Sequence, residues 1–164
     1  MSSVVVPNIT KAVIELLKGN AAYVSTEQAA LVATLKTRVS ATRMGYEWDD
    51  AWVIAATGRI HPAIVVTRTG GIGPDMYIPY AQGRVQVRCY ASYFHTALEA
   101  ATLVQQILLP IAPGIGGWTA GSTQVASVTG VADPLEGQDP EYEHRRWADV
   151  VANLYYSRIA KVAA

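Results

Sequence analysis

Histidine, cysteine and activated serine are the side chains best suited to metal binding or nucleophilic chemistry, and this chain offers little of either. Its three histidines, His61, His95 and His144, lack the close spacing that zinc ligands show. Cys89 is the only cysteine, so no intrachain disulfide forms, and its place in an alternating apolar pattern suits a small buried hydrophobe. No Gly-x-Ser-x-Gly element supplies a nucleophile. The sequence therefore predicts no metal ion, no cofactor and no catalytic centre.

A glycine-rich segment at residues 69–73, TGGIG, is the one stretch with the composition of a phosphate-binding loop. Such a loop must open a helix, because the helical N–H groups hold the phosphate. Here Pro74, Asp75 and Pro79 follow without a helical period. Turn glycines are the favoured interpretation. A further interpretation, the least favoured of three, is a small enzyme or ligand-binding module with its site in loop 70–79. A ring of several copies in solution would argue against this interpretation.

Acidic residues gather in two places. Glu47, Asp49 and Asp50 precede a short apolar run, where carboxylates favour a helix N-terminus. A second set lies in the turn-rich segment 133–143, which lacks the ligand order of a calcium loop and favours solvent or interchain contact. Two Asp-Pro steps with Gly137 between them predict that 133–140 is a projecting tip, not packed, whose residues 135–138 are dispensable for folding.

Arginines and aromatic residues on strand faces complete the candidate site. Arg84 and Arg88 point outward from one predicted strand, and their two interpretations are ion pairs on the strand face or pairing with acidic loops of a neighbouring subunit. Outward aromatic residues of the last strand suit an interface. The predicted subunit or tail/neck interface residues are Arg84, Arg88, Asp133, Glu136, Asp139, Glu141, Arg145, Arg146, Trp147 and Tyr155.

Composition bounds the class of protein. The 164 residues suit one domain, and 51% hydrophobic residues suffice for a core. Thirteen basic residues balance thirteen acidic ones, which disfavours a free-standing nucleic-acid binder. A charged fraction of only 16% favours oligomerisation. The first ten residues do not have the pattern of a secretory signal, and no apolar run approaches the roughly 20 residues of a membrane span.

Periodicity predicts the elements that position these residues. Helices are expected at 9–18, capped by Asn8 or Thr10 and ended by Gly19, at 29–35 after a capping box that starts at Ser25, and at 94–108. Residues 51–56 read as a short helix or a strand. Strands are expected at 63–68, 84–91, 122–131 and 147–156, with a loop at 70–79. The fold class is α+β: a mostly antiparallel sheet of four to five strands with helices packed on one face.

In this order the segments resemble the tail terminator, or tail completion, proteins of long-tailed bacteriophages. The residues that carry the resemblance are ITKAVIELLKGN, PAIVVTR, RVQVRCYASYFHTALEAATLVQQIL and DPLEGQDPEYEHRRWADVVANLYY. A strand reading R-V-Q-V before an alanine-rich helix is typical of that family, as is a final strand after an acidic loop that ends in arginine. The resemblance covers most of residues 1–164 as one domain. Residues 24–60, longer than is usual in the family, are a possible insertion.

The resemblance implies a structural virion protein without catalytic residues. Family members form six-fold rings that cap the tail tube, end its polymerisation and join the tail to the head connector. The implied partners are further copies of the chain in a hexamer, the tail tube protein and a connector or stopper protein. The genome would pass through the ring without sequence-specific binding, and no membrane is involved. The implied place is the tail–neck junction of the virion, after assembly in the host cytoplasm. A neck or head-completion protein is the alternative.

Overall fold

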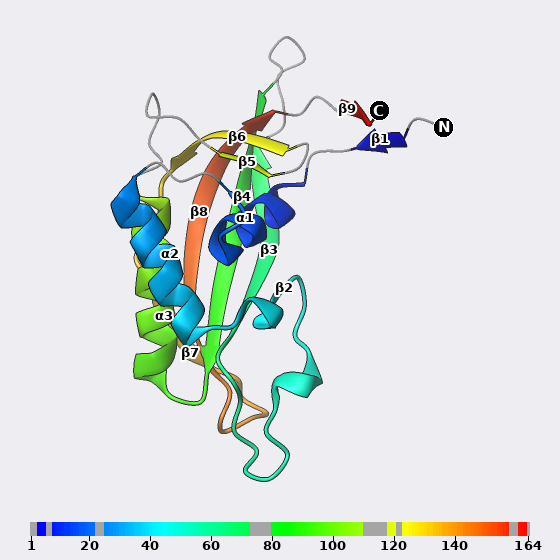
Figure 1. The fold of residues 1–164 in the computed structure, drawn as a ribbon. Coiled ribbons are helices and arrows are strands. Elements are labelled where there is room, and N and C mark those ends of the chain that lie inside the picture. The colour runs from blue at the N-terminus through cyan, green and yellow to red at the C-terminus, as the bar shows by residue number, and fades with distance from the viewer. Residues whose placement is uncertain are drawn as a thin grey trace.

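A long, mostly antiparallel sheet with helices on one side forms the body of the molecule (Figure 1). The computed structural model describes residues 3–5, 8–21, 25–72, 80–109, 118–120, 123–157 and 161–163. In chain order the elements are β1 (Ser3–Val5), α1 (Ile9–Lys18), α2 (Thr26–Arg38), the 3-10 turn η1 (Ala41–Arg43), β2 (Met44–Gly45), the 3-10 turn η2 (Asp50–Trp52), β3 (Ala63–Ile72), β4 (Tyr80–Ala91), α3 (Phe94–Leu108), β5 (Trp118–Ala120), β6 (Thr123–Thr129), β7 (Leu135–Gln138), β8 (Arg146–Ser157) and β9 (Lys161–Ala163).

Strands β4 and β8 form the centre of the sheet and pair antiparallel over twelve positions each. The strand order is β2-β3-β4-β8-β6-β5, and β7 pairs with the part of β8 that β6 leaves open. Only β2 runs parallel to its neighbour, β3. Within the described residues this sheet has seven strands, so it is larger than the four to five expected. The α+β class, the antiparallel pairing and the helices on one face are confirmed.

Side-chain caps start α1 and α2, whereas α3 starts at Tyr93 without a capping hydrogen bond from that side chain. Asn8 accepts a hydrogen bond from the Lys11 N–H at the start of α1, and Gly19, with φ of 88°, ends it. Ser25 caps α2 through the Gln28 N–H. The Gln28 side chain is buried and donates to the Ile107 carbonyl oxygen near the end of α3, at 2.8 Å. This bond fixes α2 against α3.

Two expectations about local structure were wrong, and a third was right only in part. At residues 51–56, expected as a short helix or a strand, the chain forms one 3-10 turn, Asp50–Trp52, with Asp49 as its cap, and irregular chain follows. β3 continues through Gly70 and Gly71 to Ile72, because these glycines pair with β4 instead of forming a loop; the rest of that predicted loop, 73–79, lies outside the described residues. Segment 133–140 contains strand β7, paired with β8 from Leu135↔Asp149 to Gln138↔Arg146. It is therefore not an unpacked tip.

The main core lies between the helices and one face of the sheet. The alternating residues of β4, Val85, Val87, Cys89 and Ala91, all point into it with at most 1% exposure, as their period predicts. The other face of β4 and β8 carries polar and aromatic side chains. No helix within the described residues is long and apolar enough to cross a membrane.

Burial of Cys89 makes the free energy of unfolding depend on pH in the alkaline range. Desolvation, and then the Asp149 charge, raise the pKa of the Cys89 thiol far above its ordinary value of 9.0. A raised folded-state pKa contributes stability that is complete below the unfolded-state value and is lost as the pH rises above it. We expect the free energy of unfolding to fall by about 1.4 kcal/mol per pH unit above about pH 9 from this thiol. Cys89→Ala should remove that part of the slope in urea unfolding between pH 8 and 10; equal slopes in both proteins would contradict it.

Candidate functional site: the helix-free face of the sheet

The face of β3, β4 and β8 that turns away from the helices holds four of the ten candidate residues, Arg84, Arg88, Trp147 and Tyr155, and we call it the helix-free face. It forms because alternate strand residues point to opposite sides, so those between the core positions gather here. Its side chains also include Val65 and Thr67 of β3, Gln86 and Tyr90 of β4, and Asp149 and Val151 of β8.

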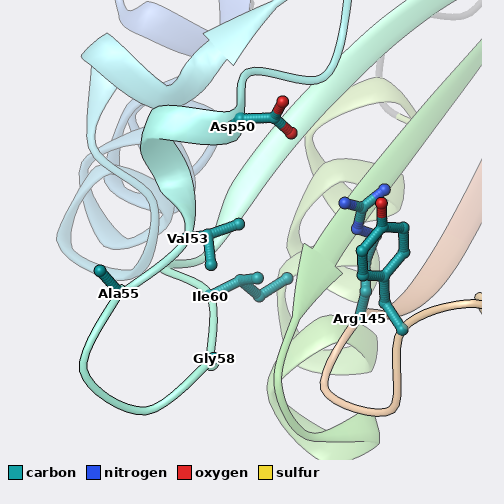
Figure 2. Close-up of a pocket in the computed structure, with 7 residues that line it drawn as sticks. Asp50, Val53, Ala55, Gly58, Ile60 and Arg145 are labelled. Carbon is teal, nitrogen blue, oxygen red and sulfur yellow. The ribbon is translucent and has the colours of Figure 1, made fainter.

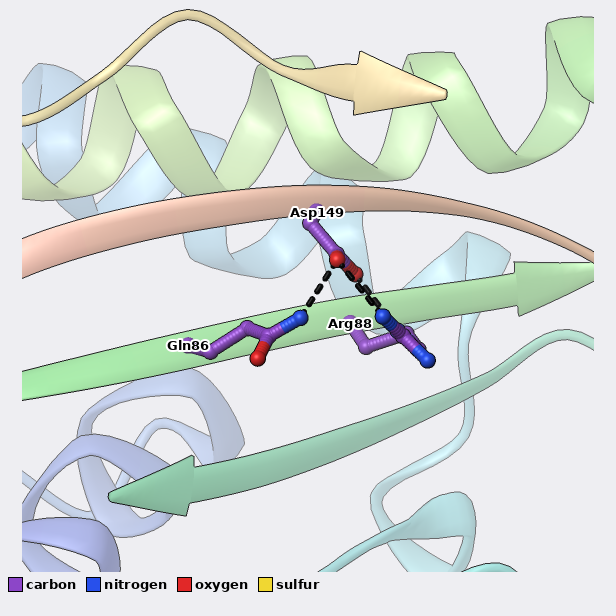
Figure 3. A network of polar contacts seen from close by, with 3 residues as sticks. All are labelled: Gln86, Arg88 and Asp149. Carbon is purple, nitrogen blue, oxygen red and sulfur yellow. Dashed lines mark hydrogen bonds and ion pairs between the residues drawn. The ribbon is translucent and has the colours of Figure 1, made fainter. Parts of the chain in front are cut away.

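An ion pair with a second donor lies at the centre of this face (Figure 3). Arg88 Nε lies 2.7 Å from Asp149 Oδ1 and Nη2 lies 2.8 Å from Oδ2, a two-pronged contact. Gln86 Nε2 also donates to Asp149 Oδ2. The Asp149 side chain is only 8% exposed. These contacts raise the pKa of Arg88 above its already high ordinary range, mainly through the hydrogen bonds to Asp149.

The Arg88 contact is the first of the two interpretations of that residue, an ion pair on the strand face, because its acidic partner Asp149 lies in the same chain. A contact of Arg88 with a neighbouring subunit stays a prediction. The Arg88 guanidinium also stacks on the Trp147 ring, with Cζ 4.0 Å from the centroid. Arg84, by contrast, is exposed and donates to Asn153 Oδ1 at 3.3 Å. Arg84 therefore keeps more of its charge available for a neighbour.

Strand β7 lies against Trp147. A β-carbon at Gly137 would overlap the Trp147 ring, so only glycine lets the β7 backbone approach this closely. Deletion of residues 135–138 would remove a paired strand and uncover Trp147. The expectation that folding would be untouched by this deletion is therefore corrected: the two Asp-Pro steps flank a short edge strand.

An aromatic cluster covers the lower end of the helix-free face. Trp52 is 8% exposed and packs with Ala63 and Val65 of β3, joined by Trp48 and Tyr90. The Trp48 ring meets those of Trp52 and Tyr90 edge-on, with centroids 5.3 Å and 4.9 Å apart. The segment between β2 and β3 therefore crosses to the side of the sheet opposite the helices.

Arg145 joins this cluster to the turn that precedes β8. Its Nη1 lies 3.3 Å from Asp139 Oδ2, and its Cζ lies 4.0 Å from the ring centroids of both Trp48 and Tyr142. The structure thus brings the predicted residues Asp139 and Arg145 together within one chain. Among the described residues, Arg145 Nε is buried without a hydrogen-bond partner, as is Nε of Arg146, whose guanidinium lies over Phe94 at 4.6 Å.

A pocket of about 560 Å³ opens between the loop that joins β2 to β3 and the loop that joins β7 to β8 (Figure 2). Val53 and Ile60 point into it, and Asp50 and Arg145 flank it. Its full lining is Asp50, Val53, Ala55, Gly58, Ile60, Tyr142 and Arg145. Sequence reasoning assigned none of the first five to a site, because only the chain path between β2 and β3 brings them together.

The remaining candidates are dispersed. Asp133 accepts a hydrogen bond from the Gln105 side chain at 2.8 Å, Glu136 and Glu141 are exposed, and Tyr155 is 38% exposed on β8. Within the described part of the chain, no group of three or more histidine, cysteine or acidic side chains is placed to hold a metal ion.

Comparison with known proteins shows a likeness in fold. No protein-family model and no curated protein matches the chain. Among solved structures, a chain from the virion of a native gene transfer agent particle has a TM-score of 0.55 at 11% sequence identity. The match covers 90% of this chain and 93% of that one. The two proteins therefore share a fold over nearly their whole length.

Proposed function

We propose that this chain is a structural virion protein, a tail terminator that forms a six-fold ring on the end of a phage-like tail tube. The observation that carries the proposal is the fold shared with a chain of the gene transfer agent virion over 90% of this chain. The order of segments that resembles tail terminator proteins supports the same role. As a terminator, the ring ends growth of the tube and presents its other rim to the head connector.

The surface of the chain suits a subunit with several neighbours. Large apolar side chains stand exposed on different elements, among them Tyr46, Tyr93, Leu109, Leu135 and Tyr142. In a ring, contacts between different patches of successive copies close on themselves and cover such residues. Interface contacts from Arg84, Glu136, Glu141 and Tyr155 are part of this proposal.

The test is assembly, alone and on tubes. We expect light scattering and negative-stain images of the purified chain to show a closed ring, or a ring that forms when polymerised tail tube protein is added. Added during polymerisation, the chain should stop tube growth and label one end of each tube. A strictly monomeric chain that leaves tubes uncapped would contradict the proposal. Labelling one layer closer to the capsid would assign the chain to the neck instead.

A further inference from the structure

The two loops at the lower end of the sheet, residues 46–61 and 139–145, form what we call the tip. They meet through Arg145, which stacks on Trp48 from the first loop and Tyr142 from the second. Backbone bonds brace each loop: the His61 N–H donates to the Trp52 carbonyl at 2.9 Å, and the Asp139 N–H donates to the Arg145 carbonyl at 2.9 Å. The pocket between the loops is therefore walled by ordered chain (Figure 2).

The tip is strongly acidic in a chain that is neutral as a whole. It carries six carboxylates against two arginines, a net charge of −4, whereas the whole chain has a net charge of 0. Both arginines are already engaged: Arg145 pairs with Asp139, and Arg59 lies over the Tyr93 ring at 4.9 Å. The tip carboxylates are Glu47, Asp49, Asp50, Asp139, Glu141 and Glu143. Opposite charge on a partner is therefore favoured here.

The pocket has the features that accommodate a long cationic side chain. Val53, Ala55 and Ile60 give an apolar wall for an aliphatic stem. Asp50 lines the pocket, and one of its carboxylate oxygens, Oδ1, accepts a hydrogen bond from Trp48 Nε1 at 3.0 Å, which orients the group. The Tyr142 ring already holds the Arg145 guanidinium, which also lines the pocket and is paired with Asp139, so Asp50 is the group that we assign to an incoming cation.

We propose that the tip is a docking surface for a basic segment of another protein, which inserts an arginine or lysine side chain into this pocket beside Asp50. The negative charge of the tip disfavours nucleic acid, and an apolar wall beside a carboxylate matches the aliphatic stem and cationic end of a protein side chain, so we commit to a protein as the occupant. The inference specifies the chemistry of the partner that binds at the rim of the proposed ring. It rests on the proposed function only for the place of that partner in the particle.

The pocket is tested on the isolated chain with N-acetyl-arginine amide as the probe and N-acetyl-glutamine amide as the neutral control. We expect amide resonances of residues 53–60 and 142 to shift on addition of the arginine probe, with half-saturation on the order of millimolar, and to move little with the control. Asp50→Asn should weaken binding roughly tenfold, because a charged acceptor is replaced by a neutral one. Glu27→Asn, on α2 away from the tip, is the matched control. Equal shifts with both probes, or binding unaffected by Asp50→Asn, would overturn the proposal.

The occupant is tested in assembly with Asp50→Lys. We expect rings to form as in the unchanged protein, while joining to the next component of the particle falls at least roughly tenfold. If Asp50→Lys instead abolishes the ring, the pocket holds a second copy of this chain and the commitment to another protein is wrong. The probe titration does not depend on ring formation, so a chain that binds the arginine probe but never forms rings would overturn the proposed function alone.

Discussion

Arg88→Met is expected to lower the free energy of unfolding by about 3 kcal/mol, because it leaves the Asp149 carboxylate buried without its cation. This loss of unfolding free energy is at the low end of the range for buried ion pairs that lose one partner, because the Arg88 side chain is 32% exposed and solvent already screens part of the charge. The substitution also removes the guanidinium from the Trp147 ring. Urea unfolding of the purified variant measures the loss.

Two further variants make this prediction specific. Arg84→Met, on the same face but exposed, should change stability by less than about 0.5 kcal/mol. The double variant Arg88→Met with Asp149→Leu should recover much of the loss, because it removes both charges together. If Arg88→Met weakens ring assembly but leaves unfolding unchanged, Arg88 acts between subunits and its contact with Asp149 contributes little to the fold.

Trp118→Ala is expected to be the most destabilising single change, at about 3–5 kcal/mol. Trp118 is 3% exposed, and its Nε1 donates to the Ala12 carbonyl oxygen of α1 at 2.9 Å. The ring therefore joins the outermost strand of the sheet, β5, to the first helix. For a chain of this size the loss corresponds to a decrease of the melting temperature by roughly 10 °C, which calorimetry measures directly.

The size of the Trp118 effect comes mostly from packing. Trp118→Phe keeps a six-membered aromatic ring and loses the N–H donor with the five-membered ring that carries it, so we expect a cost nearer 1–2 kcal/mol. Tyr46→Ala removes an aromatic side chain that is 47% exposed and should cost less than about 1 kcal/mol. Equal losses for the alanine and phenylalanine variants would mean that the hydrogen bond, and not the buried ring, dominates.

The sequence was most informative where a single period runs unbroken. The alternation in 84–91 and the helical spacing in 94–108 predicted β4, α3 and the one-sided core, because burial on one face demands those repeats. Capping residues were equally reliable: Asn8, Ser25 and Gly19 stand where the helices begin or end. Periodicity and capping both depend on residues that are close together in the chain, so the sequence alone could predict them.

Contacts between distant strands were beyond such rules. Arg88 and Asp149 could both be placed on outward faces, but only the register of β4 on β8 sets them opposite each other. Likewise, β7 is too short for a period to identify it, and its pairing depends on Gly137 lying against Trp147. The pocket forms because the chain between β2 and β3 crosses to the face of the sheet opposite the helices. Sequence reasoning found the tip's Asp139 and Arg145, but not the residues that surround them.

The position of β8 also bears on when the protein can fold during its synthesis. This strand lies between β4 and β6 in the middle of the sheet, although it is the last strand of that sheet in the chain. Until it is added, β4 and β6 have no common neighbour, and the helices have only half a sheet to cover. Pairing strands this far apart in sequence closes long loops, which slows folding. The main sheet is therefore completed only after residue 157 has left the ribosome, so surfaces that depend on the finished sheet are not presented by nascent chains from which β8 has not yet emerged.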